Sequence, residues 1–311
     1  MARKKTAKAT GQAGSKISKE DLADAKSYFR ANELLLNPPI KRAAYSDRTA
    51  WVMASMAQLV YERFEEGGKA KKLLQIKLKF GGFELIGEFN SPKTDTQAFL
   101  VSNGEYAVLA FRGTEVARKM DIAIDARAFR ASVFEGRVHK GFVEAYKSVE
   151  VQVLKALKKM GDLPLYITGH SLGAALATVA TQYLERDRIL RDQIAACYTF
   201  GSPRVGDWQF DREFKSAIYR VVNTTDIVTV IPLLAMGYIH IGDIRFLVRS
   251  MGDIRRGVPL LRRMFFFLMA AFRLFGPLVG DHAIEQYRRK LEAIAQDRNL
   301  DLYYDARSGG R

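Results

Sequence analysis

The pentapeptide Gly169-His-Ser-Leu-Gly173 is the first feature of this sequence whose residue types and spacing could carry out chemistry. An apolar run at residues 165–168 precedes it and a small-residue helical pattern follows it, which is the order that a strand, a tight turn and a helix require. On such a turn Ser171 would project from the carboxyl end of the strand, and only glycines would let the neighbouring backbone approach. The pattern predicts that Ser171 is a nucleophile for acyl transfer.

An acyl-transfer site also needs hydrogen-bond donors for the negative charge that develops on the carbonyl oxygen. The helix predicted after Ser171 aims backbone N–H groups at this position, and the N–H of Leu172 is the first of them. A second donor is expected from a loop after an earlier strand, where Thr114 follows the apolar run at residues 106–111. We therefore predict that Leu172 and Thr114 form an oxyanion hole.

Several motifs in chain order resemble those of class 3 lipases, over about residues 45–287. The motifs are Phe111-Arg-Gly-Thr114, Val138-His-Lys-Gly-Phe142, residues 167–177 around Ser171, and Thr199-Phe-Gly-Ser-Pro-Arg-Val-Gly-Asp207. The resemblance implies an α/β-hydrolase fold and hydrolysis of lipid esters, with neither a metal nor an organic cofactor.

The acid and the base are expected after Ser171, because enzymes with this turn carry them in the chain order serine, acid, histidine. Asp226 ends a predicted strand and turn and resembles the family's acid; a plain turn-forming aspartate in Thr-Thr-Asp is the alternative. His282 precedes a helical pattern that contains Tyr287, and this resembles the family's Asp-His-x-x-Tyr with a longer spacing. We predict Asp226 as the acid and His282 as the general base. Asp207 has the pattern of a helix cap.

The other three histidines are predicted to be structural. His240 alternates with apolar neighbours, which indicates a strand residue, and it resembles a noncatalytic histidine of the family. His139 comes too early in the chain order, and His170 would face away from the acyl group on the turn.

Alternating strand and helix patterns predict the α/β class, with a mostly parallel central sheet, helices on both faces and an N-terminal helical extension. Residues 1–18 are predicted to be a disordered basic tail, residues 19–45 a helical extension, and residues 46–311 the α/β-hydrolase domain. Strands are predicted at residues 83–89, 97–101, 106–111, 165–168, 195–200 and 219–223, and helices at residues 19–36, 46–66, 142–160 and 171–184.

Two further segments bear on lipid contact. Residues 115–128 occupy the place of a helical lid in the resembled family, although a plain connecting helix is the alternative. The segment from about Arg245 to Val279 is basic at its start and rich in phenylalanine and leucine after it. Its longest uncharged run is too short to span a bilayer, so it predicts an interfacial helix that meets an anionic membrane; a buried core helix is the alternative.

The composition limits the remaining functions. A formal net charge of +15 would attract polyanions, but no aromatic-interleaved basic motif supports a nucleic-acid partner. The single cysteine, Cys197, lies in an apolar stretch and is expected in the core. No signal-peptide pattern follows the basic N-terminus, so a cytoplasmic or peripheral membrane location is expected. We predict a serine-dependent lipid ester hydrolase, with a catalytically weak, lipase-like membrane-binding protein as the alternative.

Overall fold

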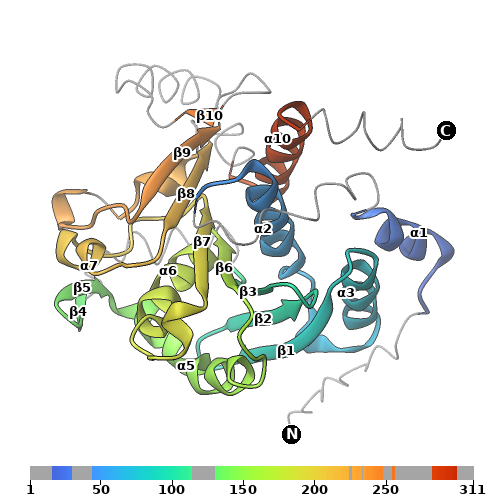
Figure 1. Cartoon of the computed structure of the whole chain (residues 1–311), viewed down its shortest axis with the longest axis horizontal. Coiled ribbons are helices and arrows are strands. Elements are labelled where there is room, and N and C mark those ends of the chain that lie inside the picture. Colours follow the sequence, from blue (N-terminus) through green and yellow to red (C-terminus); the bar gives the residue numbers. More distant parts are fainter. Residues whose placement is uncertain are drawn as a thin grey trace, which may run out of the picture.

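The computed structural model describes residues 16–29, 44–113, 130–223, 226–232, 234–247, 254–255 and 282–299. Within these residues the centre is an eight-stranded sheet in the order β1-β2-β3-β6-β7-β8-β9-β10 (Figure 1). The strands are β1 (Glu84–Ser91), β2 (Thr96–Ser102), β3 (Ala107–Phe111), β6 (Leu165–His170), β7 (Ile194–Phe200), β8 (Ile218–Asn223), β9 (Asp243–Leu247) and β10 (Ile254–Arg255).

Strand direction divides the sheet into a parallel centre and antiparallel edges. β3, β6, β7, β8 and β9 pair in parallel, whereas β1 and β2 form an antiparallel meander that leads into β3, and β10 pairs antiparallel with β9. The carboxyl ends of the parallel strands therefore meet at one edge of the sheet, which is where loops of such folds carry their functional side chains. The predicted mostly parallel sheet is confirmed.

Helices cover both faces of the sheet, as predicted. On one face α2 (Asp47–Leu59), α3 (Gly68–Phe80) and α10 (Ile284–Asp297) pack with sheet residues such as Tyr166 and Phe200. On the other face α5 (Lys140–Leu157) and α6 (Leu172–Leu184) pack with sheet residues such as Ile167. Alternation along each strand sends successive side chains into these two separate cores.

Smaller elements complete the described chain. They are the two-stranded sheet of β4 (Arg130–Val133) and β5 (Gly136–His139), the short helix α7 (Trp208–Arg212), and the 3₁₀ turns η2 (Phe64–Glu66), η3 (Leu190–Asp192), η4 (Ile227–Val230) and η5 (Leu234–Met236). No helix among the described residues has the length and apolar character needed to cross a bilayer.

The N-terminal helix is shorter than predicted. α1 (Lys19–Ser27) begins at the predicted cap, where Ser18 and Asp21 form a reciprocal capping box. It ends at Ser27 because Phe29 turns into the core, where it is 0% exposed and meets Trp51 edge-on at 6.1 Å. α1 packs against α3, so this extension contributes to the body of the protein.

Arg245 corrects the prediction that the basic segment faces a membrane from its first residue. Arg245 lies in β9 and is 4% exposed. Its guanidinium lies 5.0 Å from the ring centre of Tyr45 and 5.3 Å from that of Tyr219, and it pairs with Asp243 at 2.7 Å. The aromatic faces and the carboxylate stabilise a buried cation, so Arg245 cannot contact lipid. Residues 248–253 and 256–279 of the predicted interfacial segment lie outside the described residues.

Candidate active site

Ser171 lies on a strained turn between β6 and α6. Its φ of 59° and ψ of −124° place a residue that has a side chain in a region of the backbone map that favours glycine. The two flanking glycines are required by crowding: a Cβ on Gly169 would lie 2.2 Å from the carbonyl oxygen of Gly173, and one on Gly173 would lie 2.3 Å from that of Phe111. The strand, turn and helix therefore force Ser171 out from the edge of the sheet, as predicted from the pentapeptide.

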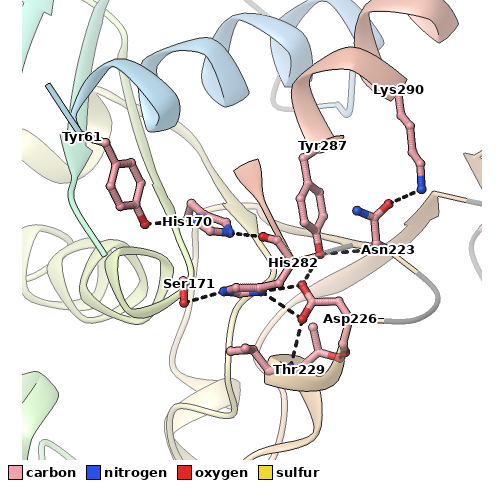
Figure 2. Close-up of polar contacts among 10 residues, drawn as sticks. Tyr61, His170, Ser171, Asn223, Asp226, Thr229, His282, Tyr287 and Lys290 are labelled. Atoms are coloured by element: carbon pink, nitrogen blue, oxygen red, sulfur yellow. Dashed lines mark hydrogen bonds and ion pairs between the residues drawn. The ribbon is translucent and has the colours of Figure 1, made fainter. Parts of the chain in front are cut away.

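The structure brings Ser171, His282 and Asp226 together, although 111 residues separate the first two along the chain (Figure 2). His282 Nε2 lies 2.8 Å from Ser171 Oγ, and His282 Nδ1 lies 2.8 Å from Asp226 Oδ2 and 2.9 Å from Asp226 Oδ1. These are normal hydrogen-bond distances. Ser171 follows β6, Asp226 follows β8, and His282 precedes α10, so three separate loops supply the arrangement.

The contacts fix which nitrogen of His282 carries the proton. The Asp226 carboxylate is an acceptor, so Nδ1 carries the hydrogen and donates to it. Nε2 then presents a lone pair to the Ser171 hydroxyl, which donates across 2.8 Å. In this tautomer His282 is placed to take the proton of Ser171, and Asp226 is placed to stabilise the imidazolium that results.

Asp226 is held by donors on several sides. It caps η4, where its Oδ1 accepts from the Val228 N–H at 2.9 Å. Its Oδ2 accepts from the Tyr287 hydroxyl at 2.5 Å, and that hydroxyl oxygen accepts from the Asn223 N–H at 3.0 Å. Tyr287 belongs to α10, the helix that follows His282. The sequence showed Tyr287 only as part of a motif, and the structure shows which carboxylate it contacts.

Gly201 is a site residue that sequence reasoning did not single out. Its φ of +55° lies in the left-handed region, and a Cβ there would lie 2.6 Å from Asp226 Oδ2 and 3.1 Å from His282 Cε1. Gly201 follows β7, in the quoted motif Thr199–Asp207. A glycine directly after a buried parallel strand was the signal that could have identified it.

The oxyanion side is described in part. Leu172 opens α6, so its N–H is among the first four of the helix, which have no carbonyl partner within it. Thr114 lies outside the described residues. Gly113 directly before it passes beside the nucleophile, because a Cβ on Gly113 would lie 3.3 Å from Ser171 Cβ. Both oxyanion assignments stay predictions.

The remaining candidates have structural contacts. His139 caps α5 through Nδ1, which accepts from the Gly141 N–H at 3.2 Å, and burial lowers its pKa. Asp207 caps α7 as predicted, accepting from the Phe210 N–H at 3.0 Å. The prediction that His240 is a strand residue was wrong, because it belongs to no strand. It lies between β9 and Ile239, whose isolated bridge to Gly206 is outside the main sheet.

The three aligned side chains are buried. Ser171 is 0% exposed, Asp226 1% and His282 2%. The predicted lid, residues 115–128, lies outside the described residues. Within the part of the chain that is described, no cluster of three or more histidine, cysteine or acidic side chains is arranged to hold a metal ion.

Comparison with known protein families identifies a family with a segment like the one that carries this site. Residues 108–236 match the model of the family described as lipase (class 3), a segment that includes Ser171 and Asp226. The chain therefore contains a class 3 lipase segment. His282 lies beyond the matched segment and joins the site through the fold.

Relatives that match part of this chain come from fungi and plants. It is 38% identical over 110 residues to secreted mono- and diacylglycerol lipase 1 of Fusarium solani, covering 33% of this chain and 32% of that protein. It is 35% identical over 108 residues to the chloroplastic phospholipase A(1) DAD1 of Arabidopsis thaliana, covering 30% and 24%. The chain thus aligns with about a third or less of the length of these two relatives.

The fold matches solved lipases over a longer stretch. The crystal structure of the lipase from Rhizopus microsporus var. chinensis aligns with a TM-score of 0.54 at 26% identity. The alignment covers 72% of this chain and 82% of that structure. The likeness in the sheet and its helices therefore extends well beyond the segment that the family model matches.

Proposed function

We propose that this protein hydrolyses carboxylic ester bonds in lipids through an acyl-enzyme on Ser171. The observation that carries the proposal is the continuous hydrogen-bonded chain from Ser171 Oγ through the His282 ring to the Asp226 carboxylate, with each contact at 2.8–2.9 Å. This series of hydrogen bonds is the arrangement that converts a serine hydroxyl into a nucleophile.

In this mechanism His282 Nε2 takes the proton of Ser171 while Oγ attacks the acyl carbonyl carbon, and the carbonyl oxygen becomes an anion. The Leu172 N–H and Thr114 donate hydrogen bonds to that anion. His282 then gives the proton to the leaving alkoxide, which departs as an alcohol and leaves Ser171 acylated. A water molecule, deprotonated by His282, then attacks the acyl carbon. The bond between that carbon and Ser171 Oγ breaks, His282 returns the proton to Oγ, and the fatty acid leaves.

The substrates are acylglycerols or phospholipids. The names of the relatives support this range, because one is a mono- and diacylglycerol lipase and another is a phospholipase A(1). Both reactions break an ester between a fatty acyl group and a glycerol oxygen. The same nucleophile and base serve either head group, so head-group choice depends on the rest of the pocket.

The test is hydrolysis of triacylglycerol, diacylglycerol and diacyl phospholipid by the wild-type protein and by Ser171→Ala. We expect fatty acid release by the wild type and a loss of about 10⁴-fold or more in the variant, since removing the nucleophile removes the acyl-enzyme route. A fluorophosphonate should label the wild type at Ser171 and leave the variant unlabelled. A folded wild type that neither hydrolyses any ester nor reacts would favour the catalytically weak, membrane-binding alternative.

We also infer that the substrate is met at an anionic membrane surface, which the protein contacts peripherally. The net charge of +15 supports this, as does the apolar, phenylalanine-rich sequence of residues 258–279 that follows Arg249, Arg255 and Arg256. Sedimentation with vesicles of phosphatidylcholine, with and without 30 mol% phosphatidylglycerol as a probe at roughly the anionic level of cytoplasmic leaflets, tests it. Replacing those three arginines by glutamine should abolish the preference for the anionic vesicles, and an unchanged preference would contradict the inference.

A further inference from the structure

His170 lies directly before the nucleophile but points to the opposite side of β6 from Ile167. Alternation along β6 places it with Tyr166 and Thr168 on the face covered by α2 and α10. It is 4% exposed. Its Nδ1 lies 2.9 Å from the Tyr61 hydroxyl, and its Nε2 lies 2.6 Å from the carbonyl oxygen of His282 (Figure 2). A histidine expected to be structural thus contacts the main chain of the predicted base.

The His282 carbonyl oxygen, which can only accept, fixes the direction of these two hydrogen bonds. A carbonyl oxygen cannot donate, so His170 Nε2 carries the hydrogen and donates to His282. Nδ1 of the neutral ring then accepts, and the Tyr61 hydroxyl donates to it. Burial raises the pKa of the Tyr61 phenol well above its usual value, so the hydroxyl keeps the proton that it donates. The Tyr61 hydroxyl also lies against Gly113, because a Cβ on Gly113 would lie 2.5 Å from its oxygen.

Tyr61 is held at this position by the end of β3. Arg112, next to Gly113, donates to the carbonyl of Val60 at 2.7 Å and to that of Glu62 at 2.8 Å. Its guanidinium also pairs with Glu65 at 2.5 Å. The residues on both sides of Tyr61 are therefore fixed to the same loop that Gly113 begins. A phenol anchored in this way has little freedom to leave His170.

The neutral state of His170 matters because its ring centre lies 4.5 Å from that of His282. A positive charge on His170 would oppose the positive charge that His282 acquires during the reaction. In the hydrogen-bonded chain both ring nitrogens are occupied, one as donor and one as acceptor, and the ring carries no charge. Tyr61 and Tyr287 are also titratable rings beside it, at 5.9 Å and 6.1 Å, and the Tyr287 hydroxyl donates its proton to Asp226.

We propose that Tyr61 and His170 are positioning residues for the reaction described under Proposed function, on which this inference rests. The hydrogen-bonded chain runs in one direction, from Tyr61 to His170 and from His170 to the His282 carbonyl, and it starts where the Tyr61 hydroxyl lies against Gly113. Gly113 directly precedes the predicted oxyanion donor Thr114. The chain therefore sets the distance between the general base and the oxyanion loop, and successive hydrogen bonds of one direction strengthen each other.

The test compares His170→Phe, which keeps a ring and removes both hydrogen bonds, with His170→Gln, whose amide N–H replaces Nε2–H. With a soluble short-chain ester we expect His170→Phe to lower kcat by about 10- to 100-fold with KM changed less than about threefold, since a base displaced by a fraction of an ångström loses its alignment. His170→Gln should recover most of kcat. If the two variants are equally impaired while both remain folded, His170 has only a packing role.

Tyr61→Phe provides a second test, because it removes the hydroxyl that bonds His170 Nδ1. We expect kcat to fall by about tenfold, and the double variant with His170→Phe to be no worse than His170→Phe alone, because the two residues act through one chain. If the loss of kcat in the double variant equals the product of the losses in the two single variants, the proposal is overturned. Tyr146→Phe is the matched control: its hydroxyl is buried on the opposite face of the sheet with no hydrogen-bond partner within the described structure, and kcat should not change.

Two measurements separate failure of this proposal from failure of the proposed function. An active wild type whose kcat is unchanged by His170→Phe would reject the positioning role and leave the hydrolase intact. Nitrogen-15 NMR of labelled histidines requires no activity: the chain predicts the Nε2–H tautomer for His170 and the Nδ1–H tautomer for His282. A signal from His170 in the Nδ1–H form would overturn the chain even in an inactive protein.

Discussion

At the scale of single residues, the carboxylate of Asp226 depends on its donors because it is 1% exposed. A buried carboxylate is costly unless hydrogen bonds replace the water that it has lost. The Val228 N–H, the His282 ring and the Tyr287 hydroxyl supply these bonds. Only the His282 contact takes part in the proposed chemistry, so the other two hold the carboxylate in the orientation that this contact needs.

Tyr287→Phe tests this dependence. The variant removes the donor at 2.5 Å from Asp226 and the acceptor of the Asn223 N–H. We expect kcat to fall by about 5- to 30-fold, corresponding to about 1–2 kcal/mol for a hydrogen bond to a charged group. Thermal or urea unfolding should show a loss of about 1–3 kcal/mol from the stranded N–H. A variant with the wild-type kcat would mean that Asp226 does not need this donor.

Gly201→Ala tests how tightly the site is packed. The added methyl group would lie 2.6 Å from Asp226 Oδ2, so the carboxylate must move, and we expect kcat to fall by at least about 10²-fold. Gly161→Ala is the matched control, because Gly161 also has a positive φ, +78°, but nothing lies within 4 Å of the added Cβ. The control should cost about 1 kcal/mol of backbone strain and leave kcat unchanged. Equal activities would show that strain and not contact governs Gly201.

The site was predictable where its signal is local and not where it depends on packing. Ser171 and its two glycines form one pentapeptide, so the sequence carries the whole turn. Gly201 and Tyr61 have no such pattern, because each becomes relevant only when β6, β7 and α2 lie side by side. Asp226 and His282 could be proposed from chain order and resemblance, but their distance from Ser171 is a property of the sheet edge at which their loops meet.

At the scale of elements, the predictions agree best with the structure where the sequence itself marks the end of a helix or strand. α2 begins at Asp47, one residue after the predicted start, with Ser46 as its cap, and β3 and β7 end at the predicted residues. α3 was not predicted, because its sequence is rich in lysine and only Leu74 and Leu78 on it are fully buried. β9 was not predicted because charged residues interrupt it, and the burial of Arg245 depends on aromatic partners from distant segments.

The cap of α5 makes folding stability depend on pH. Burial lowers the pKa of His139 below its unfolded value of about 6.5, so the unfolded chain takes up a proton first as the pH falls. The stabilisation is therefore complete above about pH 6.5 and is lost as the pH falls through the lowered value. His139→Asn retains an acceptor for the Gly141 N–H but does not titrate there.

We expect the melting temperature of the wild type to decline more steeply than that of His139→Asn between about pH 6.5 and pH 5. Above about pH 7 the two melting temperatures should change in parallel. Scanning calorimetry or circular dichroism at several pH values measures the difference in slope. Parallel curves over the whole range would show that His139 does not take up its proton on unfolding in this interval.

At the scale of the whole molecule, the two helical layers enclose the middle of the sheet, and β7 lies at its centre between β6 and β8 (Figure 1). Its residues alternate between the two cores, with Tyr198 and Phe200 on the side of α2 and Cys197 on the side of α6. Ser171, Asp226 and His282 follow or face strands of this central group. The alignment of the site should therefore persist for as long as the sheet itself.

Cys197 reports on the opening of that central strand. It is 0% exposed, and burial raises the pKa of its thiol to about 12, so the thiolate fraction at pH 8 is about 10⁻⁴ even where a reagent could enter. We expect labelling of the native protein by iodoacetamide to proceed only through global unfolding, with the same urea dependence as unfolding measured by circular dichroism. Val151→Cys, at a position 76% exposed on α5, should gain one thiol that labels at the rate of a free cysteine. Labelling of Cys197 that is fast or independent of urea would mean that β7 opens without global unfolding, in which case the site would lose its alignment long before the protein melts.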